Sequence, residues 1–338
     1  MITQNGTNER AVAVSAIMPV LNEADHLAVA VGSVFSQDYP GEIELVLALG
    51  PSQDDTDVVA EKLAANDSRI TLVRNPSGRT PAGLNAALGA TSHDIVVRVD
   101  GHCELPPDYV RIAVDTLART GADNVGGVMA AQGQTPFESA VAVAMTSKLG
   151  VGAAAFHVGG VEGETETVYL GVFRAQTLQQ VGGYDEQFDR AQDWEMNHRI
   201  RMAGGKIWFN PAMQVAYRPR PNPKALAKQY FHYGQWRREV MRRYPDTVSL
   251  RYLAPPVAVT ALAAGAAAGV AGSVTGSSIL KLGYLIPATY AAAVSVGGWL
   301  TAKNESVAVK ARVPLALATM HCSWGIGFLA SRRRTLRD

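Results

Sequence analysis

The sequence predicts an α/β protein in which a mostly parallel sheet is covered by helices on both faces. Four short apolar runs, at 12–20, 43–49, 70–73 and 95–99, are rich in β-branched residues. Each run is too short to cross a membrane and stops at turn residues, which is typical of a buried strand. A helical segment follows each of the first three runs. Strands that alternate with helices in this way indicate βαβ units and a parallel sheet.

The helical segments between these strands are indicated by the spacing of their apolar residues and by the position of their acidic residues. In residues 24–35 apolar side chains recur at the spacing of one helix face. The next helix begins just after Asp54 and carries acidic residues in its first turn, where the helix dipole favours them. Residues 82–88 form a short third helix.

Residues 105–222 are less regular than the first hundred. A glycine- and glutamate-rich loop at 159–166 has the composition of a mobile segment, and we expect it to exclude water from a site. The other elements that we expect are helices at 109–119 and 193–202 and strands at 125–130, 168–174, 207–209 and 215–217.

Composition argues against several classes of protein. A chain of 338 residues is long enough for one sizeable domain with an appendage or for two domains, and a formal charge of +1 gives no support for nucleic acid as a partner. Neither GxGxxG nor GxxxxGK[ST] occurs, so dinucleotide-binding and P-loop interpretations lose their main support. Two cysteines, Cys103 and Cys322, make a disulfide framework unexpected and favour a reducing cytosolic setting. Residues 1–10 are polar and do not resemble a signal peptide.

Residues 224–244 predict an amphipathic helix with aromatic and apolar residues on one face and lysines and arginines on the other. Such a helix is typical of a membrane interface, and the alternative is a helix packed on the globular domain. Arg237 falls within the apolar face, where a charge is costly unless it is paired. We therefore expect Arg237, beside Trp236, to reach towards an anionic group of an acceptor or phosphate.

Three weakly charged segments, at 257–274, 279–300 and 313–330, are each close to the ~20 residues needed to cross a membrane. Arginines precede the first segment and follow the last, and basic residues also lie at 303–312. Each basic group favours the cytoplasmic side, and three full crossings cannot place all of them there. Either one segment is re-entrant or the C-terminal tail breaks the rule.

Asp100-Gly101-His102 follows the fourth predicted strand. Ligands of open α/β sheets bind at the carboxyl ends of the strands, and Asp and His both ligate divalent cations. Gly101 lets the backbone turn tightly between the two side chains. The motif therefore predicts a metal site, and the alternative is an ordinary Asp-Gly turn with a surface histidine.

Six short motifs occur in an order that resembles family 2 glycosyltransferases with a GT-A fold, and most closely their ExoA-like, succinoglycan-biosynthesis membrane branch. The resemblance covers roughly residues 12–245. The motifs are Met18-Pro19-Val20-Leu21-Asn22-Glu23, Gly50-Pro51-Ser52-Gln53-Asp54-Asp55-Thr56, Gly83-Leu84-Asn85-Ala86-Ala87, Asp100-Gly101-His102, Gly182-Gly183-Tyr184-Asp185-Glu186 and Gln192-Asp193-Trp194-Glu195.

The resemblance implies an inverting transfer of sugar from a UDP- or GDP-sugar donor, with Asp193 as the catalytic base. Asp100 and His102 would take the place of the DxD motif, which holds Mn²⁺ or Mg²⁺ and the donor diphosphate. Glu195 would position the acceptor or pair with Arg199, and Asp193 without a catalytic role would serve the helix dipole or pair with Arg199. The residues that would bind the nucleotide and donor are Pro19, Val20, Asn22, Glu23, Asp54, Arg79, Asn85 and Asp100; those that would bind acceptor or phosphate are Glu195, Arg199, Trp236 and Arg237.

Three positions depart from the family pattern. His102 replaces the second Asp of DxD, and an imidazole suits Mn²⁺ at least as well as Mg²⁺. Gln192 replaces an acidic residue before the base, which removes a like charge from beside Asp193. Residues 48–50 lack the acidic pair that contacts the nucleotide base in many relatives, which leaves the base selectivity open.

These observations predict a glycosyltransferase domain at 1–222, an amphipathic region at 223–252, two or three transmembrane segments at 253–331 and a basic tail at 332–338. We expect a multi-pass protein of the cell membrane with its catalytic domain in the cytoplasm and a lipid-linked or membrane-proximal glycan as acceptor, in contact with membrane lipids. Two alternatives remain: a catalytically silent, membrane-anchored sugar-nucleotide-binding scaffold, and a metal-dependent nucleotidyltransferase. The second lacks the glycine-rich, lysine-bearing loop that would cradle a triphosphate.

Overall fold

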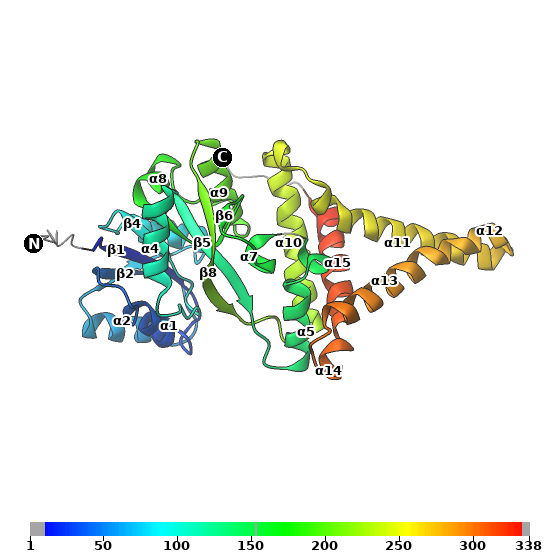
Figure 1. Cartoon of the computed structure of the whole chain (residues 1–338), viewed down its shortest axis with the longest axis horizontal. Coiled ribbons are helices and arrows are strands. Elements are labelled where there is room, and N and C mark those ends of the chain that lie inside the picture. The colour runs from blue at the N-terminus through cyan, green and yellow to red at the C-terminus, as the bar shows by residue number, and fades with distance from the viewer. Residues whose placement is uncertain (1–10, 153, 333–338) are drawn as a thin grey trace, which may run out of the picture. The chain divides into compact units, whose positions relative to one another are not determined.

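The computed structural model describes residues 11–152 and 154–332, which divide into two compact units. The first unit contains residues up to Val128 and Gly160–Ala216, and it holds most of an eight-stranded sheet (Figure 1). The strand order is β3-β2-β1-β4-β7-β5-β8-β6. The strands are β1 (Val14–Val20), β2 (Ile43–Leu49), β3 (Ile70–Arg74), β4 (Ile95–Arg98), β5 (Asn124–Ala131), β6 (Gly163–Glu164), β7 (Tyr169–Arg174) and β8 (Ile207–Tyr217).

The four strands predicted in the first hundred residues are all present and run parallel to their neighbours. Beyond β4 the sheet changes character, because β7 is antiparallel to both β4 and β5, and β6 is antiparallel to β8. The expectation of a mostly parallel sheet therefore holds for one half of it, and the whole is a mixed α/β sheet. The two short strands expected at 207–209 and 215–217 are one strand, β8, whose Met213 and Val215 are buried on the same alternating face.

Helices cover both faces of the parallel half, as predicted. Even-numbered residues of β1 face the core formed with α1 (Leu27–Phe35) and α4 (Tyr109–Thr120), while α3 (Thr80–Leu88) packs on the opposite face over β1 and β2. Three further helices of this unit are α2 (Thr56–Asn66), α8 (Ala175–Gln180) and α9 (Gln192–Met202).

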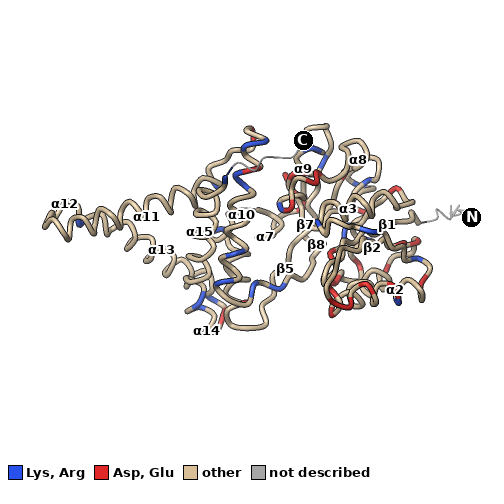
Figure 2. Tube along the Cα trace, turned by 180° about the vertical axis from the view of Figure 1, so that it is seen from behind, with Lys and Arg blue, Asp and Glu red and all other residues tan. Residues whose placement is uncertain are grey.

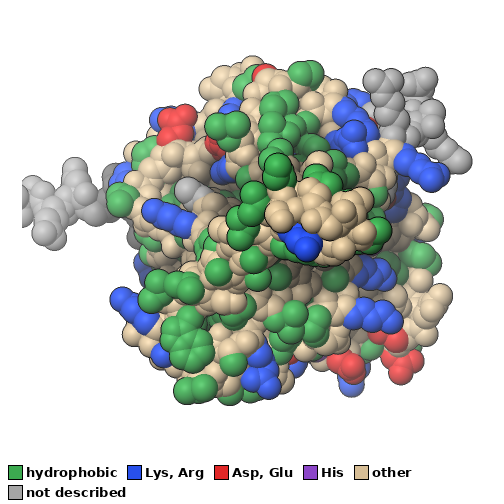
Figure 3. Space-filling model, turned by 90° about the vertical axis from the view of Figure 1, so that its right-hand side faces the viewer, with side chains coloured by type: hydrophobic (Ala, Val, Ile, Leu, Met, Phe, Trp, Pro, Cys, Tyr) green, Lys and Arg blue, Asp and Glu red, His purple; other side chains and the backbone are tan. Residues whose placement is uncertain are grey.

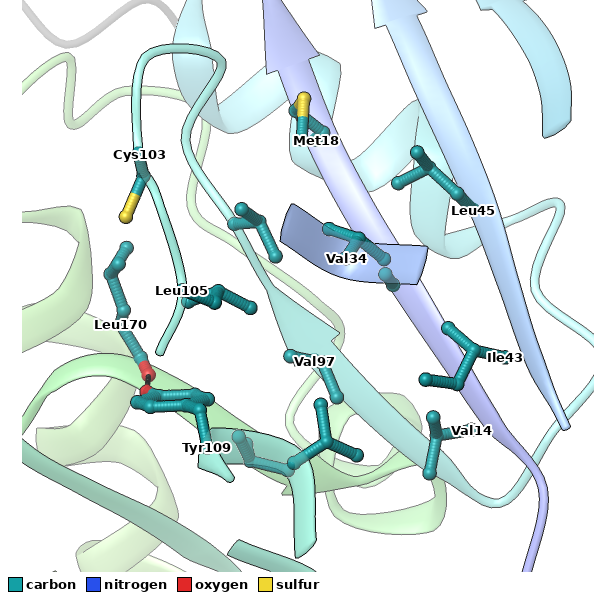
Figure 4. Packing of buried hydrophobic residues seen from close by; sticks show 14 of the residues in the cluster. Val14, Met18, Val34, Ile43, Leu45, Val97, Cys103, Leu105, Tyr109 and Leu170 are labelled. Carbon is teal, nitrogen blue, oxygen red and sulfur yellow. Dashed lines mark hydrogen bonds between the residues drawn. The ribbon is translucent and has the colours of Figure 1, made fainter. Parts of the chain in front are cut away.

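The core beneath α1 and α4 is closed by residues that follow β4. In Figure 4, Cys103 and Leu105 lie beside Leu170, and the hydroxyl of Tyr109 donates a hydrogen bond of 2.6 Å to the Leu170 carbonyl. Cys103 is 4% exposed, and burial raises the pKa of its thiol, so it packs as a small apolar side chain. This packing fixes the segment that carries Asp100 and His102.

The second unit contains residues 129–159 and those from Tyr217 onward. Its first segment had no expected helices, yet it forms α5 (Pro136–Met145), α6 (Lys148–Val151) and α7 (Ala155–Val158). Residues 129–159 thus group with the C-terminal half of the chain, which the sequence did not lead us to expect. The remaining helices are α10 (Pro223–Arg243), α11 (Leu250–Thr275), α12 (Ser278–Lys281), α13 (Leu285–Thr301), α14 (Val307–Lys310) and α15 (Val313–Ala330), with single 3-10 turns at Pro245–Thr247 and Leu282–Tyr284.

The amphipathic helix is α10, and it packs against α15 at very short range. A Cβ atom on Gly234 would come within 2.0 Å of the Trp324 carbonyl, and one on Gly327 would meet Phe231 equally closely, so only glycine permits this approach. Arg238 and Arg242, expected on the solvent-facing side, instead donate hydrogen bonds to carbonyls at the end of α15. The packing partner of α10 is thus α15, within the second unit, and the membrane interface expected for α10 stays a prediction.

Three helical stretches are long and apolar enough to span a membrane: Leu250–Thr275, Ser278–Thr301 and Val307–Ala330. The first two form a hairpin that leads away from α15 (Figure 1), and Figure 2 shows hardly any charge along it, in contrast to α10. The polar N-terminus at 1–10 and most of the expected basic tail, 333–338, lie outside the described residues.

Candidate active site

The candidate site lies at the carboxyl ends of β1, β2 and β4, where sequence analysis placed it. Its central residue is Arg98, the last residue of β4, whose side chain is only 4% exposed. The Arg98 guanidinium lies 3.2 Å from the Asp100 carboxylate and also forms an ion pair with Asp193. The two carboxylates predicted to hold the cation and to act as base are therefore brought together by one buried cation.

Arg98 stays charged in this position. Burial, the largest single influence, would lower the pKa of Arg98, but the Asp100 carboxylate together with Tyr184 and Tyr169 outweighs it, and the pKa is raised above its ordinary value. The ring of Tyr184, which is buried, lies 5.9 Å from the guanidinium carbon and closes one side of the cation. Asp100 and Asp193 are each partly exposed, at 24% and 32%, so both can meet a ligand from solvent.

Asp193 stands in the first turn of α9. The residue before that helix, Ala191, has a φ of +62°, in the left-handed region that side chains other than glycine avoid. The chain thus reverses sharply just before the carboxylate. Its ion partner is Arg98, whereas the predicted alternative partner, Arg199, pairs with Glu195.

His102 is held by Glu23. The imidazole Nδ1 lies 2.7 Å from Glu23 Oε1, and the His102 side chain is 60% exposed. A Cβ atom on Gly101 would lie 3.2 Å from Glu23 Cγ, so the glycine lets the two loops approach. A carboxylate on one ring nitrogen orients the imidazole, as it does for many metal-binding histidines. Glu23 was expected at the nucleoside, and here its contact is with the metal motif.

The loop after β1 is bound to the loop after β2. The Asn22 amide group accepts from the Gln53 N–H at 2.7 Å, and the Thr56 hydroxyl accepts from the Glu23 N–H at 2.8 Å. Asp54 accepts from the Thr56 hydroxyl, which holds the pKa of Asp54 below its usual range, and from the Ala24 N–H. Pro19 and Val20 lie at the end of β1 directly before this loop. These contacts form one wall of the site; donor contacts by the same residues stay a prediction.

Asn85 of α3 clamps the glycine turn. Its amide donates to the Tyr184 carbonyl and accepts from the Tyr184 N–H, both at 2.8 Å. Gly183 has a φ of +70°, and a Cβ atom there would lie 2.7 Å from Asn85 Oδ1. The motifs around Asn85 and Gly183 are therefore two halves of one structural contact, which positions Tyr184 beside Arg98. A direct contact of Asn85 with donor stays a prediction.

Glu195 and Arg199 form a buried bidentate ion pair, with N···O distances of 2.6 and 2.7 Å. Glu195 is 0% exposed, and Arg199 also donates to the carbonyls of Val181 and Gly183. The pair thus fixes the same glycine turn from the side of α9. Of the two roles considered for Glu195, pairing is the one seen, and contact with an acceptor, which needs an exposed side chain, stays a prediction.

Arg79 pairs with Asp189 at 2.5 Å, and both side chains are more than 40% exposed. The expected phosphate contact would have to compete with this weak surface pair. The 159–166 loop is tied down in its second half: Thr165 N–H donates to Ile207 and Glu162 accepts from Trp208. These hydrogen bonds do not agree with the mobility that we expected for this part of the 159–166 loop.

Trp236 and Arg237 belong to α10 in the second unit. Trp236 is 4% exposed, and the Arg237 guanidinium lies 3.9 Å from the centre of the Tyr252 ring. The charge in the apolar face of α10 is thus placed over an aromatic ring of the same unit. Contact of these two residues with an acceptor stays a prediction.

Arg98 was not among the residues expected at the site. The signal was present, since a lone arginine in an otherwise apolar buried strand needs a charged partner. Side chains two residues apart in a strand point to the same face, so Asp100 was the obvious candidate for that partner.

The residues at this place fit a divalent cation. Asp100 and His102 supply a carboxylate and an imidazole at the end of one strand, and Glu23 orients the imidazole. No group of three metal-binding side chains occurs in the described ranges, 11–152 and 154–332. The protein therefore offers two ligands, and phosphate oxygens and water would complete the shell, as in other sites where a cation accompanies a phosphate substrate.

Known proteins with similar sequences decide the family. The model of "Glycosyl transferase family 2" matches residues 15–163. The chain is 32% identical over 315 residues to the succinoglycan biosynthesis protein ExoA of Rhizobium meliloti (strain 1021), and the match covers 92% of each chain. The chain belongs to glycosyltransferase family 2.

A second relative and a solved structure are also similar to this chain. Glycosyltransferase AglE of Haloferax volcanii is 27% identical over 249 residues, which cover 70% of this chain and 76% of AglE. The mannosyltransferase PcManGT from Pyrobaculum calidifontis, solved in complex with GDP-Man and Mn²⁺, has a TM-score of 0.63 at 19% identity and covers 96% of this chain and 88% of its own. The likeness to PcManGT shows the GT-A-like fold, and the family 2 relatives show that this chain is a transferase.

Proposed function

We propose that this family 2 enzyme moves a sugar from a nucleoside-diphosphate donor to a hydroxyl of a lipid-linked or membrane-proximal glycan, with inversion at the anomeric carbon. Asp193 is the base, and Asp100 with His102 holds a divalent cation. The observation that carries the proposal is the shared ion pair: Arg98 contacts both Asp100 and Asp193, so the two carboxylates face one site.

In the proposed reaction the acceptor oxygen attacks the anomeric carbon while its proton passes to Asp193. The new C–O bond forms on the face opposite the breaking bond, and the nucleoside diphosphate leaves with the bonding electron pair. Proton removal by a placed carboxylate contributes roughly 10²–10⁴-fold to such a rate. A bound cation neutralises the charge that develops on the leaving diphosphate.

Observations that do not concern the reacting groups also support this proposal. A relative of similar fold was solved with GDP-Man and Mn²⁺, which favours a sugar nucleotide and a cation as the ligands of this site. The ExoA relative takes part in succinoglycan biosynthesis, which favours a glycan acceptor. Three apolar helices favour attachment to a membrane, with the catalytic unit on the cytoplasmic side, where sugar nucleotides occur.

The test uses purified full-length enzyme and the variant Asp193→Asn. We expect a UDP- or GDP-sugar with Mn²⁺ to raise the melting temperature of wild type and variant alike, because ligands that bind the native state stabilise it. Transfer should fall by about 10²–10⁴-fold in the variant. Chelation of the cation should abolish the ligand-induced shift in both proteins.

Asp189→Asn is the matched control, because it removes an exposed carboxylate four residues earlier. It should keep both donor binding and transfer. If Asp193→Asn transfers sugar at the wild-type rate, Asp193 is not the base. If wild type binds donor and neither transfers nor slowly hydrolyses it, the protein is a binding scaffold.

A further inference from the structure

The contact between α10 and α15 bears on which apolar helices cross the membrane. The two helices run parallel and in register: Phe231 faces Gly327, and further along Arg238 donates to the carbonyls of Phe328 at 2.9 Å and Leu329 at 2.8 Å. At the end, Arg242 donates to the Ser331 carbonyl at 2.8 Å. Helices joined in this way along their length lie at the same depth in any membrane.

The sequence of α10 does not suit the interior of a membrane. The helix spans 21 residues, about 31 Å, which is the full thickness of a hydrocarbon core. Its charged residues lie towards both ends (Figure 2), and the uncharged stretch between them, 229–236, is only about 12 Å long, far shorter than a hydrocarbon core of ~30 Å. The charged residues are Lys224, Lys228, Arg237, Arg238, Glu239, Arg242 and Arg243. If α15 crossed the membrane, it would draw this whole series into the hydrocarbon.

The apolar character of α15 has another explanation. Protein surrounds α15 on several sides, since it packs against α5, α10, α11 and α13. In its apolar window 39% is buried inside the protein, against 17% for α11 and 6% for the stretch Ser278–Thr301. A helix enclosed by other helices is apolar all round without any contact with lipid.

The α11–α13 hairpin has the opposite properties. Its helices close on each other near the tip, where Gly272 meets Lys281 and Gly265 meets Gly283. Their stretches of 26 and 24 residues exceed the ~20 needed for a crossing. Seen from the tip, the hairpin shows apolar side chains around an end that is mostly tan, with one basic side chain (Figure 3). The apolar side chains of the two helices that are well exposed include Val257, Val270, Val274, Leu285, Val296 and Leu300.

The two ends of the hairpin meet α15 at different points. Pro255 and Val259 of α11 contact Gly325, while Gly298 of α13 contacts Val313 and Leu317. Gly325 and Val313 are twelve residues apart, or about 18 Å along a helix. Helix α15 thus connects the two ends of the hairpin across its open side, as Figure 1 shows, and it does not extend the hairpin as a third parallel span.

We infer that, in the described chain, only the α11–α13 hairpin crosses the membrane, and that α10 and α15 lie together along the surface on the side of the catalytic unit. Two crossings return the chain to its starting side. The basic residues at 237–251, at 303–312 and after Ser331 then all lie on that side, in accord with the positive-inside rule. Lys281, at the tip, is the basic residue left on the opposite side.

The test maps single cysteines in the full-length protein in sealed vesicles of both orientations, after replacement of Cys103 and Cys322 by alanine. Ser68→Cys, at an exposed position, marks the catalytic side, and Ser278→Cys marks the hairpin tip. Ser306→Cys marks the segment before α14. A cysteine added after residue 338 marks the C-terminus. A membrane-impermeant maleimide should label positions 68 and 306 and the C-terminus from one side and position 278 from the other.

Two results would overturn the inference. Labelling of the C-terminal cysteine from the same side as position 278 would mean that α15 crosses the membrane. Labelling of position 278 from the same side as position 68 would mean that the hairpin does not. Labelling in detergent shows that every cysteine reacts when accessible, and protease digestion of a C-terminal epitope tag gives the same answer without any cysteine substitution.

Discussion

At the scale of single residues, the site depends on the sharing of Arg98 between two carboxylates. The guanidinium is buried and lies between Asp100, at the cation position, and Asp193, at the base position. Without donor, it neutralises carboxylates that would otherwise repel each other. A divalent cation bound at Asp100 would leave Arg98 paired with Asp193 alone, and we therefore propose that donor binding and the state of the proposed base are coupled through Arg98.

We therefore predict that Arg98→Met binds Mn²⁺ alone more tightly than wild type and transfers sugar more slowly. Affinity rises because a positive charge is removed from beside a metal ligand. Transfer falls, by about 10²-fold, because the positively charged group that fixes the base is lost. Spin-resonance titration of Mn²⁺ and an assay of transfer measure the two effects.

Arg69→Met serves as the control, since it removes an exposed arginine that pairs with Asp67 just before the amino end of β3 and is not among the residues of the candidate site. It should change neither quantity by more than a few-fold. Equal Mn²⁺ affinity in wild type and Arg98→Met would show that Arg98 does not act on the cation position.

At the scale of elements, the amino ends of three parallel strands are joined by Glu44 of β2. Its carboxylate accepts from the Ser15 hydroxyl of β1 and, at 2.7 Å each, from the N–H and hydroxyl of Ser92, which precedes β4. Burial would raise the pKa of Glu44, but these hydrogen bonds outweigh it and lower the pKa below its ordinary value. This contact holds the end of the sheet opposite the site.

A lowered carboxyl pKa stabilises the fold above the unfolded-state pKa of ~4.3, and the contribution is lost as the pH falls through the folded-state pKa. Glu44→Gln should therefore lower the melting temperature most at pH 6–7, and the difference from wild type should close below about pH 4. Melting curves across this range measure it, with the exposed Glu42→Gln as the control for charge. A constant difference at every pH would assign the loss to packing alone.

We predicted the elements that a local sequence pattern indicates. We missed those that depend on contacts with distant parts of the chain. The four parallel strands are short apolar runs between turns, and their parallel direction follows from the alternation with helices. Strand β8 was divided in two because Pro211 interrupts its alternation. Helix α5 was missed because apolar residues surround it, although Thr135 and Glu138 form a capping box that marks its start.

The site was predictable only in part for a similar reason. Asp100 could be placed because it ends a recognisable strand. Asp193 is 93 residues later, and no local pattern links the two; the family resemblance supplied that link. Arg98 forms the physical bridge, and it was overlooked because it stands inside an apolar run. The contacts of Asn85 with Tyr184 and of Glu23 with His102 also join distant segments and carry no local signature.

At the scale of the whole molecule, the unit that carries the candidate site and the unit that carries the apolar helices are interleaved in the sequence. Residues 129–159 leave the catalytic sheet, form α5 to α7 and group with the C-terminal unit. Helix α5 buries Val141, Ala144 and Met145, and α15 is among its packing partners. A catalytic domain cut out at residue 216 would therefore keep an apolar helix without that partner.

We predict that a fragment of residues 1–216 aggregates and binds a hydrophobic dye. The same fragment with residues 133–158 replaced by a glycine-serine linker should be more soluble, because it lacks the exposed apolar helix. Sedimentation and dye fluorescence compare the two fragments. If the unaltered fragment is monomeric and binds no dye, α5 does not need the C-terminal helices.

Because the two units are interleaved in the sequence, α5 is synthesised well before its packing partner α15. Helix α5 leaves the ribosome about 170 residues before α15 begins, which at 5–20 residues per second is a delay of roughly 10 to 35 s. During that delay α5 lacks one of its native neighbours, while the strands before and after it are already available to pair. The sheet of the nascent chain must therefore form while α5 still lacks α15. The chain reaches its final structure only after α15 has been translated.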